Sequence, residues 1–213
     1  MRPTFSLLAI SDRAGLRALG IDPADWLRAL GGIGDGGTGA LQLREKDLDD
    51  RDLYALARLA RTLLPPPFPL LVNGRLDIAL AAGADGVHLP ADGVPAAPLR
   101  ARFGAGGTTL LIGSSTHSVA EVERARDEGA DYATFGPVYA TPGKGAPVGL
   151  RELARAAATG LPVYALGGVT LERFGELAAA GAAGIAAIRL FQSVDAMNLM
   201  RVARAARERF GRA

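Results

Sequence analysis

The feature that most restricts the fold of this chain is a regular alternation of two kinds of segment. Short runs of β-branched and aliphatic residues, typical of buried strands, alternate with Ala-, Leu- and Arg-rich segments whose apolar residues recur every three or four positions, as in helices. The predicted strands are 5–11, 40–44, 69–73, 85–89, 109–113, 131–136, 162–166 and 184–189. The predicted helices are 22–30, 49–64, 75–82, 95–102, 118–128, 149–158, 170–180 and 194–210. This order is typical of repeated βα units with parallel strands.

Eight such units within 213 residues predict a single domain, residues 1–213, folded as a TIM (β/α)8 barrel. None of the predicted strands has the pattern of an edge strand, and closure into a barrel removes edges. A weak internal repeat agrees with this: "AAGADGV" at 81–87, "DEGADYA" at 127–133 and "AAGAAGI" at 179–185 place Gly83, Gly129 and Gly181 at helix ends that favour a left-handed residue. A doubly wound open sheet uses the same units and remains the alternative.

Composition excludes several classes of function. The net charge is +2, and the 24 Lys and Arg residues form no basic run, so we expect no nucleic-acid partner. There is no cysteine, which excludes disulfides and thiolate metal sites. The apolar run near the N-terminus is too short for a signal peptide, and no run is long enough to span a membrane. We therefore expect a soluble, cytoplasmic protein without membrane contact, whose apolar helix faces would also allow a homodimer.

Candidate functional groups gather where the predicted strands end, which is where barrel enzymes carry their catalytic residues. The chain has only two lysines, Lys46 and Lys144, and both follow predicted strands on this face. A lysine is a compact, mobile charge suited to phosphate, so its restriction to these loops indicates function. The alternative is that two solvated lysines lie there by chance.

A glycine pair follows the seventh predicted strand. Gly167 and Gly168 in "LGGVT" let the backbone approach a ligand closely, and Val169 and Thr170 then open a helix whose free N–H groups favour an anion. Arg189, at the end of the eighth strand, would add a charge-assisted hydrogen bond. This arrangement predicts a phosphate site, although two glycines also occur in plain turns.

The two histidines occupy different environments. His117, in "SSTHS", follows the fifth predicted strand, and Ser118 with Glu121 forms a capping box for the next helix. An imidazole there is a candidate general acid/base, because histidine exchanges protons near neutral pH. A histidine that only hydrogen-bonds the turn is the alternative. His88 lies within the apolar run "GVHLP", and we interpret it as a hydrogen-bonded histidine of the barrel interior.

Several motifs together carry a resemblance to a known family. "QLREK", "NGRLDIALAAGADGVHL", "SSTHS", "GADYATFGPVYATPGK", "PVYALGGVT" and "GAAGIAAI" follow, in order and spacing, the pattern of the thiamine phosphate synthase family, which also contains the thiazole tautomerase TenI. The resemblance covers roughly residues 5–190. It implies a TIM barrel and a small-molecule partner, a phosphorylated thiazole of thiamine biosynthesis.

The resemblance also assigns residues. It implies that diphosphate or carboxylate groups are bound by Gln42, Arg44, Lys46, Asn73, Ser115, Thr141 and Lys144. It implies that the thiazole phosphate lies against Gly167, Gly168, Ile188 and Arg189. The family more often has a small residue where Arg189 stands.

Two glycines depart from the pattern of a synthase. In that family, Mg²⁺ neutralises the leaving diphosphate, and its carboxylate ligands stand at the positions of Gly74 and Gly93. Asp92 is one residue away and would supply one ligand after a local shift, whereas Asp77 is more simply an exposed helix residue. We therefore expect no metal site and no cofactor, with Mg²⁺ needed only if the protein is a synthase.

These departures predict the tautomerase branch of the family. The expected reaction moves a proton on a carboxythiazole phosphate, with His117 as general acid/base and with Arg44 or Lys46 facing the carboxylate. The alternative is a Mg²⁺-dependent thiamine phosphate synthase, since the cationic part of the diphosphate site is retained. A further alternative of another class is a non-catalytic sensor of phosphorylated thiamine precursors.

Overall fold

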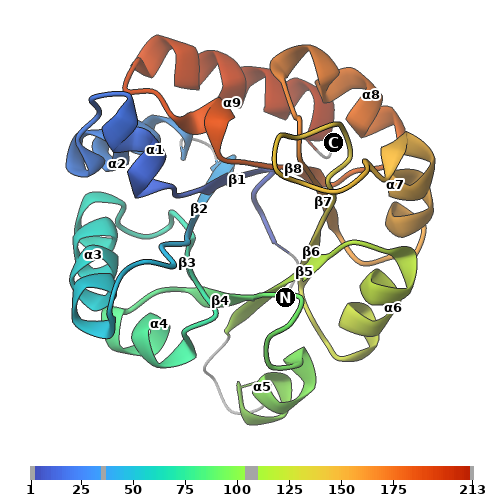
Figure 1. The fold of residues 1–213 in the computed structure, drawn as a ribbon, viewed down its shortest axis with the longest axis horizontal. Coiled ribbons are helices and arrows are strands. Elements are labelled where there is room, and N and C mark those ends of the chain that lie inside the picture. Colours follow the sequence, from blue (N-terminus) through green and yellow to red (C-terminus); the bar gives the residue numbers. More distant parts are fainter. Residues whose placement is uncertain (1–2, 35–36, 104–109, 212–213) are drawn as a thin grey trace.

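The computed structural model describes residues 3–34, 37–103 and 110–211, and these contain a closed barrel of eight parallel strands in the order β1 to β8. Figure 1 shows the strands at the centre and the helices around them. The strands are β1 Leu7–Ile10, β2 Gly39–Leu43, β3 Leu70–Asn73, β4 Gly86–Leu89, β5 Leu111–Thr116, β6 Tyr132–Phe135, β7 Val163–Leu166 and β8 Gly184–Ala187. Closure is made by β1 and β8, which pair in parallel from Leu7 with Ile185 to Ala9 with Ala187. The predicted TIM barrel is confirmed, and the open-sheet alternative is wrong.

The helices fall where the sequence predicts them, with small shifts at their ends. They are α1 Arg13–Ala18, α2 Pro23–Leu30, α3 Asp50–Leu63, α4 Leu76–Ala82, α5 Ala96–Phe103, α6 Val119–Asp127, α7 Gly149–Ala157, α8 Phe174–Ala179 and α9 Ala196–Phe210. The short α1 was not predicted, since it is only one and a half turns long. The segment 170–180 contains a 3-10 turn, Leu171–Arg173, before α8. None of the helices described is long and apolar enough to cross a membrane.

The fifth strand differs most from its prediction. The range 109–113 was expected, but residue 109 lies outside the described residues and β5 continues to Thr116. The polar residues Ser114, Ser115 and Thr116 thus belong to a strand, because each pairs with β6 in register from Ser114 with Ala133 to Thr116 with Phe135. Their polarity conceals this in the sequence, since a run of serine and threonine is typical of loops.

Two hydrophobic layers enclose the strands. An outer layer packs the helices on the barrel, and an inner cluster that includes Phe5, Leu8, Tyr132 and Tyr164 fills its interior. Tyr132 and Tyr164 meet edge to face with ring centroids 5.3 Å apart. These large rings occupy space that aliphatic side chains fill in many barrels, so the interior is packed and is not a channel.

The internal repeat has a structural explanation. In the repeats at 81–87 and 127–133, the aspartate after Gly-Ala accepts one hydrogen bond from the backbone at the start of the neighbouring strand, β3 or β5. It accepts another from an arginine of the helix before that strand, α3 or α5. Asp85 Oδ2 accepts from Leu70 N at 2.8 Å and from Arg61 Nη1 at 2.7 Å. Asp131 Oδ2 accepts from Ile112 N at 2.8 Å and is paired with Arg100. Together with the positive φ angles of Gly83, Gly129 and Gly181, these contacts fix the αβ turns at the end of the barrel opposite the predicted site.

Glycines inside the barrel wall are required by close backbone approach. A Cβ atom on Gly86 would lie 2.0 Å from the carbonyl oxygen of Leu111, whereas one on Gly175 in α8 would meet nothing within 4 Å. We therefore expect Gly86→Ala to lower the free energy of unfolding by about 1–3 kcal/mol, as overpacking does. The control Gly175→Ala should raise it by about 0.4–1 kcal/mol through the unfolded state. Urea unfolding measures both, and equal effects would contradict the close backbone approach at Gly86.

Candidate active site

The predicted site residues lie at one end of the barrel, because the carboxyl ends of parallel strands all point the same way. We call this end the mouth. Each of the strands β2, β3 and β5 to β8, or the segment that follows it, contributes predicted residues there. The described side chains are Gln42, Arg44, Lys46, Asn73, Ser115, His117, Thr141, Lys144, Ile188 and Arg189. What the sequence does not show is which of these side chains have free polar atoms.

Gln42 and Asn73 lie together inside the mouth. Gln42 Nε2 donates to Asn73 Oδ1 at 3.0 Å across the β2–β3 pair. Gln42 is 2% exposed, and its Oε1 is buried without a hydrogen-bond partner among the described residues. A buried carbonyl of this kind favours a ligand with an N–H or O–H donor. This geometry makes Gln42 Oε1 a poor contact for the phosphate or carboxylate that the sequence assigned to Gln42.

Arg44 is the cation that the structure places most clearly in the mouth. It is half-buried, and within the described residues its guanidinium has no hydrogen-bond or ion-pair partner. The adjacent Glu45 does not neutralise it, because both Glu45 carboxylate oxygens accept from the backbone N–H of Arg13, at 3.2 and 3.1 Å. Burial raises the pKa of Glu45, and a hydrogen bond from Ser11 opposes this. Arg44 therefore leaves positive charge available to an anion.

His88 is fully enclosed in the barrel interior, as the sequence indicates. Its Nδ1 lies 3.0 Å from the hydroxyl of Tyr132, and its Nε2 lies 2.9 Å from Ser115 Oγ. Burial, assisted by the charge of Arg44, lowers the pKa of His88 to about 3. The imidazole is therefore neutral at physiological pH, and its two nitrogens are engaged with protein groups.

The glycine pair after β7 is held against the segment that follows β6. Gly167 and Gly168 have φ angles of +93° and +64°, which favour glycine. A Cβ atom on Gly167 would lie 2.6 Å from Pro137 Cα, and one on Gly168 would lie 2.7 Å from Tyr139 Cβ. Packing within the protein therefore requires glycine at both positions. The sequence analysis had explained the pair by the close approach of a ligand. The same packing also brings the 137–144 segment beside the predicted phosphate site.

Arg173 is a polar group of this region that the sequence analysis missed. Its guanidinium donates to the carbonyl of Gly168 and lies 4.0 Å from the centre of the Tyr139 ring. The Tyr139 hydroxyl in turn donates to Glu176 Oε1 at 2.6 Å. A basic residue one turn after a Gly-Gly pair was the available signal. Arg189, in contrast, is exposed in a 3-10 turn after β8.

His117 lies on the outer rim of the mouth, between the ends of β5 and β6. Its Nδ1 lies 2.6 Å from the carbonyl oxygen of Gly136 and must donate to it, because that oxygen only accepts. Ser118 Oγ accepts from Glu121 N, which confirms Ser118 as the N-cap of α6. The return bond differs from that of a capping box, because Glu121 Oε2 accepts from the backbone N–H of His117 at 2.7 Å. The bond to Gly136 leaves Nε2 as the ring nitrogen for proton exchange, in a fixed tautomer.

The remaining predicted contacts, Lys46, Lys144 and Thr141, lie on the loops at the rim of the mouth. Lys46 and Lys144 are both exposed, on the loops after β2 and β6. Thr141 Oγ1 donates to the carbonyl of Tyr139 at 2.9 Å, so its hydroxyl can only accept from a ligand in this arrangement. Beside the mouth, a cavity of about 320 Å³ lies over β4 and β5, and its lining includes Asp92, Ser115, Glu121 and Arg124.

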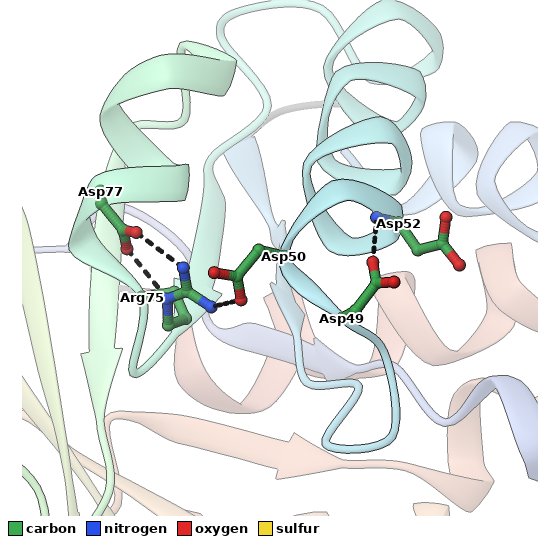
Figure 2. A network of polar contacts seen from close by, with 5 residues as sticks. All are labelled: Asp49, Asp50, Asp52, Arg75 and Asp77. Atoms are coloured by element: carbon green, nitrogen blue, oxygen red, sulfur yellow. Dashed lines mark hydrogen bonds and ion pairs between the residues drawn. The ribbon is translucent and has the colours of Figure 1, made fainter.

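The residues present do not fit a hard metal ion. Gly74 and Gly93 have no side-chain oxygen, and the described residues contain no group of three His, Cys, Asp or Glu side chains arranged to hold a metal. Asp77, the nearest acidic residue to Gly74 in the sequence, is engaged elsewhere. Figure 2 shows Arg75 between Asp77 and Asp50, which it joins as ion pairs across the first turns of α4 and α3. Arg75 faces α3 in this network, and the pKa values of Asp50 and Asp77 are lowered mainly by its hydrogen bonds.

Comparison with known proteins gives a consistent result. The family model described as "Thiamine monophosphate synthase" matches residues 18–191. A Geobacter sulfurreducens protein named "Putative thiamine-phosphate synthase" is 48% identical over 185 residues, covering 84% of this chain and 82% of that protein. A Roseiflexus thiamine-phosphate synthase is 41% identical over 69% of this chain and 63% of its own. A solved structure of thiamine phosphate pyrophosphorylase from Pyrococcus furiosus superposes with a TM-score of 0.83 and 28% identity, over 99% of both chains.

The buried histidine predicts a pH dependence of stability. Since the pKa of His88 falls from 6.5 to about 3 on folding, the unfolded chain binds one more proton than the folded chain between these values. Stability is therefore present above pH 6.5 and is lost as the pH falls, by up to about 1.4 kcal/mol per pH unit. Between pH 6.5 and 5, before most carboxylates titrate, His88→Gln should abolish this slope in urea unfolding and His117→Gln should retain it. A slope that His88→Gln leaves intact would contradict the assignment.

Proposed function

This chain belongs to the thiamine monophosphate synthase family, and from that premise we propose that it transfers a pyrimidinylmethyl group from its diphosphate ester to a thiazole phosphate. The relatives that share most of its length carry the name of this activity. The proposal therefore takes the second of the two family reactions considered from the sequence. The expected tautomerase activity is not supported by the names of these relatives.

The reaction requires anion binding more than proton transfer. The C–O bond of the diphosphate ester breaks, and the diphosphate leaves with the electron pair. The lone pair of the thiazole nitrogen forms the new C–N bond, so the ring becomes a thiazolium and no proton moves. Charge accumulates on the leaving diphosphate, and catalysis consists largely of positioning the two substrates and stabilising that charge.

The single observation that carries the proposal is the half-buried, unpaired guanidinium of Arg44. A cation held partly out of water without a carboxylate is costly unless a ligand anion compensates it. Lys46 is two residues away, and Lys144 is on the loop after β6, which lies across the barrel from β2. These flexible cations would close over a diphosphate whose inner oxygens contact Arg44. More positive charge is available than one phosphate requires.

Protein groups, and not a metal ion, would then compensate the leaving group. Gly74 and Gly93 stand where the family resemblance places the carboxylate ligands, so we route no step through Mg²⁺. Asp92 is exposed and lies beside Gly93, but one carboxylate alone does not form a specific site for a hard cation. The thiazole phosphate would bind near Gly168 and Arg189, on the opposite side of the mouth from β3 and β4.

A thiazole tautomerase is the second candidate, and two observations favour it. The first is the absence of side-chain oxygen at both glycines. The second is His117, whose Nδ1–H is fixed on Gly136 and whose Nε2 is left to remove and return a proton. Arg44 would then bind the carboxylate of a carboxythiazole phosphate in place of diphosphate.

A first experiment tests the role of the cation. The protein is supplied with the pyrimidine diphosphate and thiazole phosphate, and thiamine phosphate is measured with and without EDTA. We expect product in both conditions, and Arg44→Met should lower kcat/KM by about 10- to 100-fold, the loss of a charge-assisted hydrogen bond. The control Arg58→Met changes an exposed arginine of α3 away from the mouth. If EDTA abolishes turnover, the metal-free mechanism is wrong; if no product forms at all, the synthase proposal is wrong.

A second experiment separates the two family reactions by their need for a base. His117→Gln should leave thiamine phosphate formation within a few fold, because that reaction moves no proton. For tautomerisation of a carboxythiazole phosphate, the same change should reduce turnover by about 10²–10⁴-fold. NMR identifies the product of each reaction. A wild-type protein that tautomerises rapidly, forms no thiamine phosphate and loses turnover in His117→Gln would establish the tautomerase instead.

A further inference from the structure

A chain of polar groups runs through the barrel interior and ends at the mouth. Tyr132 on β6 contacts His88 Nδ1 on β4 at 3.0 Å, and His88 Nε2 contacts Ser115 Oγ on β5 at 2.9 Å. Tyr132 and His88 are 0% and 1% exposed, whereas Ser115, near the carboxyl end of β5, is partly exposed. The chain therefore connects a dry interior to a partly exposed serine near the mouth.

The fold makes room for this chain at one glycine. Gly113 pairs with His88 in the β4–β5 register and with Tyr132 in the β5–β6 register. A Cβ atom on Gly113 would lie 2.4 Å from the Tyr132 hydroxyl and 2.6 Å from His88 Nδ1. Any side chain at this position would separate the phenol from the imidazole. The contact between Tyr132 and His88 thus requires a glycine at position 113 of β5, the strand between them.

The direction of the hydrogen bonds follows from the proton on Tyr132. Burial raises the pKa of Tyr132, so the phenol keeps its proton, and within the described residues His88 is the hydrogen-bond partner of that hydroxyl. If Nδ1 carried the imidazole proton, the phenol proton would be buried without an acceptor, which is unfavourable. Tyr132 therefore donates to Nδ1, and the proton of neutral His88 is on Nε2.

The other groups facing His88 agree with this direction. Thr134 Oγ1 lies 3.5 Å from Nε2 and can also accept from it. The charge of Arg44 acts against a second proton on the imidazole. With Nε2–H donating to Ser115 Oγ, the Ser115 oxygen is used as an acceptor, and its own O–H is directed elsewhere.

We infer that Tyr132 and His88 are positioning residues that make Ser115 a hydrogen-bond donor to a phosphate or diphosphate oxygen of the substrate. This inference rests on the proposed function, because it supplies a contact for the anion that the proposed reaction requires. The imidazole does not exchange protons with the substrate. It fixes the direction in which the Ser115 hydroxyl points, whereas the hydroxyl of a serine without such a partner would rotate freely.

The tautomer of His88 is the first test, and it does not depend on activity. The chain has two histidines, so His117→Gln assigns the ring signals of the full-length protein in long-range ¹H–¹⁵N NMR spectra. We expect a protonated Nε2 and an unprotonated Nδ1 for His88 at neutral pH. A protonated Nδ1 would overturn the inference, whether or not the protein proves to be a synthase.

A double-mutant cycle is the second test, with inorganic diphosphate as the calorimetric probe. Ser115→Ala should raise the Kd about tenfold, and Tyr132→Phe about threefold or more, as expected for loss or misdirection of one hydrogen bond to a charged group. In the Ser115→Ala background, Tyr132→Phe should have no further effect. The control Thr134→Val removes the longer contact to the same nitrogen and should change the Kd little.

Independent effects of the two changes would show that Tyr132 acts only through packing, and the inference would fail. Circular dichroism and thermal unfolding establish that each variant is folded before its Kd is compared. A wild-type protein that binds neither phosphate nor diphosphate would count against the proposed function, while the tautomer still decides the direction of the hydrogen bonds.

Discussion

Closure of the barrel is the constraint on which the rest of the structure depends. Because β1 pairs with β8, every strand has two neighbours, and all the strands point the same way. The loops that follow the strands must therefore converge at one end, although their residues are as far apart in the sequence as Gln42 and Arg189. Closure also encloses an interior that must be filled. Phe5, Tyr132 and Tyr164 fill it below the mouth, and the polar side chains of Gln42, His88 and Ser115 lie nearer to the ligand side.

The two ends of the barrel use charge differently. At the end opposite the mouth, Asp85 and Asp131 are satisfied by backbone N–H groups and by arginines of α3 and α5, so these charges serve only to hold turns. At the rim of the mouth, Arg75 is likewise neutralised by Asp50 and Asp77. Arg44 stands apart, because the adjacent carboxylate of Glu45 is occupied by the backbone of Arg13. This contrast is what distinguishes a cation available to a ligand from the arginines that hold the fold.

Much of the fold was predictable because it depends on local patterns. Strand and helix periodicity, the left-handed glycines and the N-cap at Ser118 each involve residues close in the sequence. The full extent of β5 was not predictable, because its polar residues belong to a strand only through their pairing with β6. The role of Gly167 and Gly168 was also hidden, since the atoms that exclude a side chain there belong to Pro137 and Tyr139. The same holds for Arg173, whose partners are a carbonyl and an aromatic ring on other segments.

The balance between the two family reactions depends on how the mouth handles charge. A metal ion shared by two carboxylates would add positive charge to a diphosphate site while partly cancelling itself through its ligands. With Gly74 and Gly93 in those places, both the metal ion and its two carboxylate ligands would be lost. The positive charge of the ion and the negative charges of the carboxylates partly cancel, so the net charge of the site would change less than if only one of them were lost. In the proposed reaction, the cations at Arg44, Lys46 and Lys144 would act on the anion without competing acids at those two positions. In the proposed site, a diphosphate would be held largely by flexible side chains, so the position of the substrate would depend on rigid groups of the barrel interior such as the hydroxyl of Ser115.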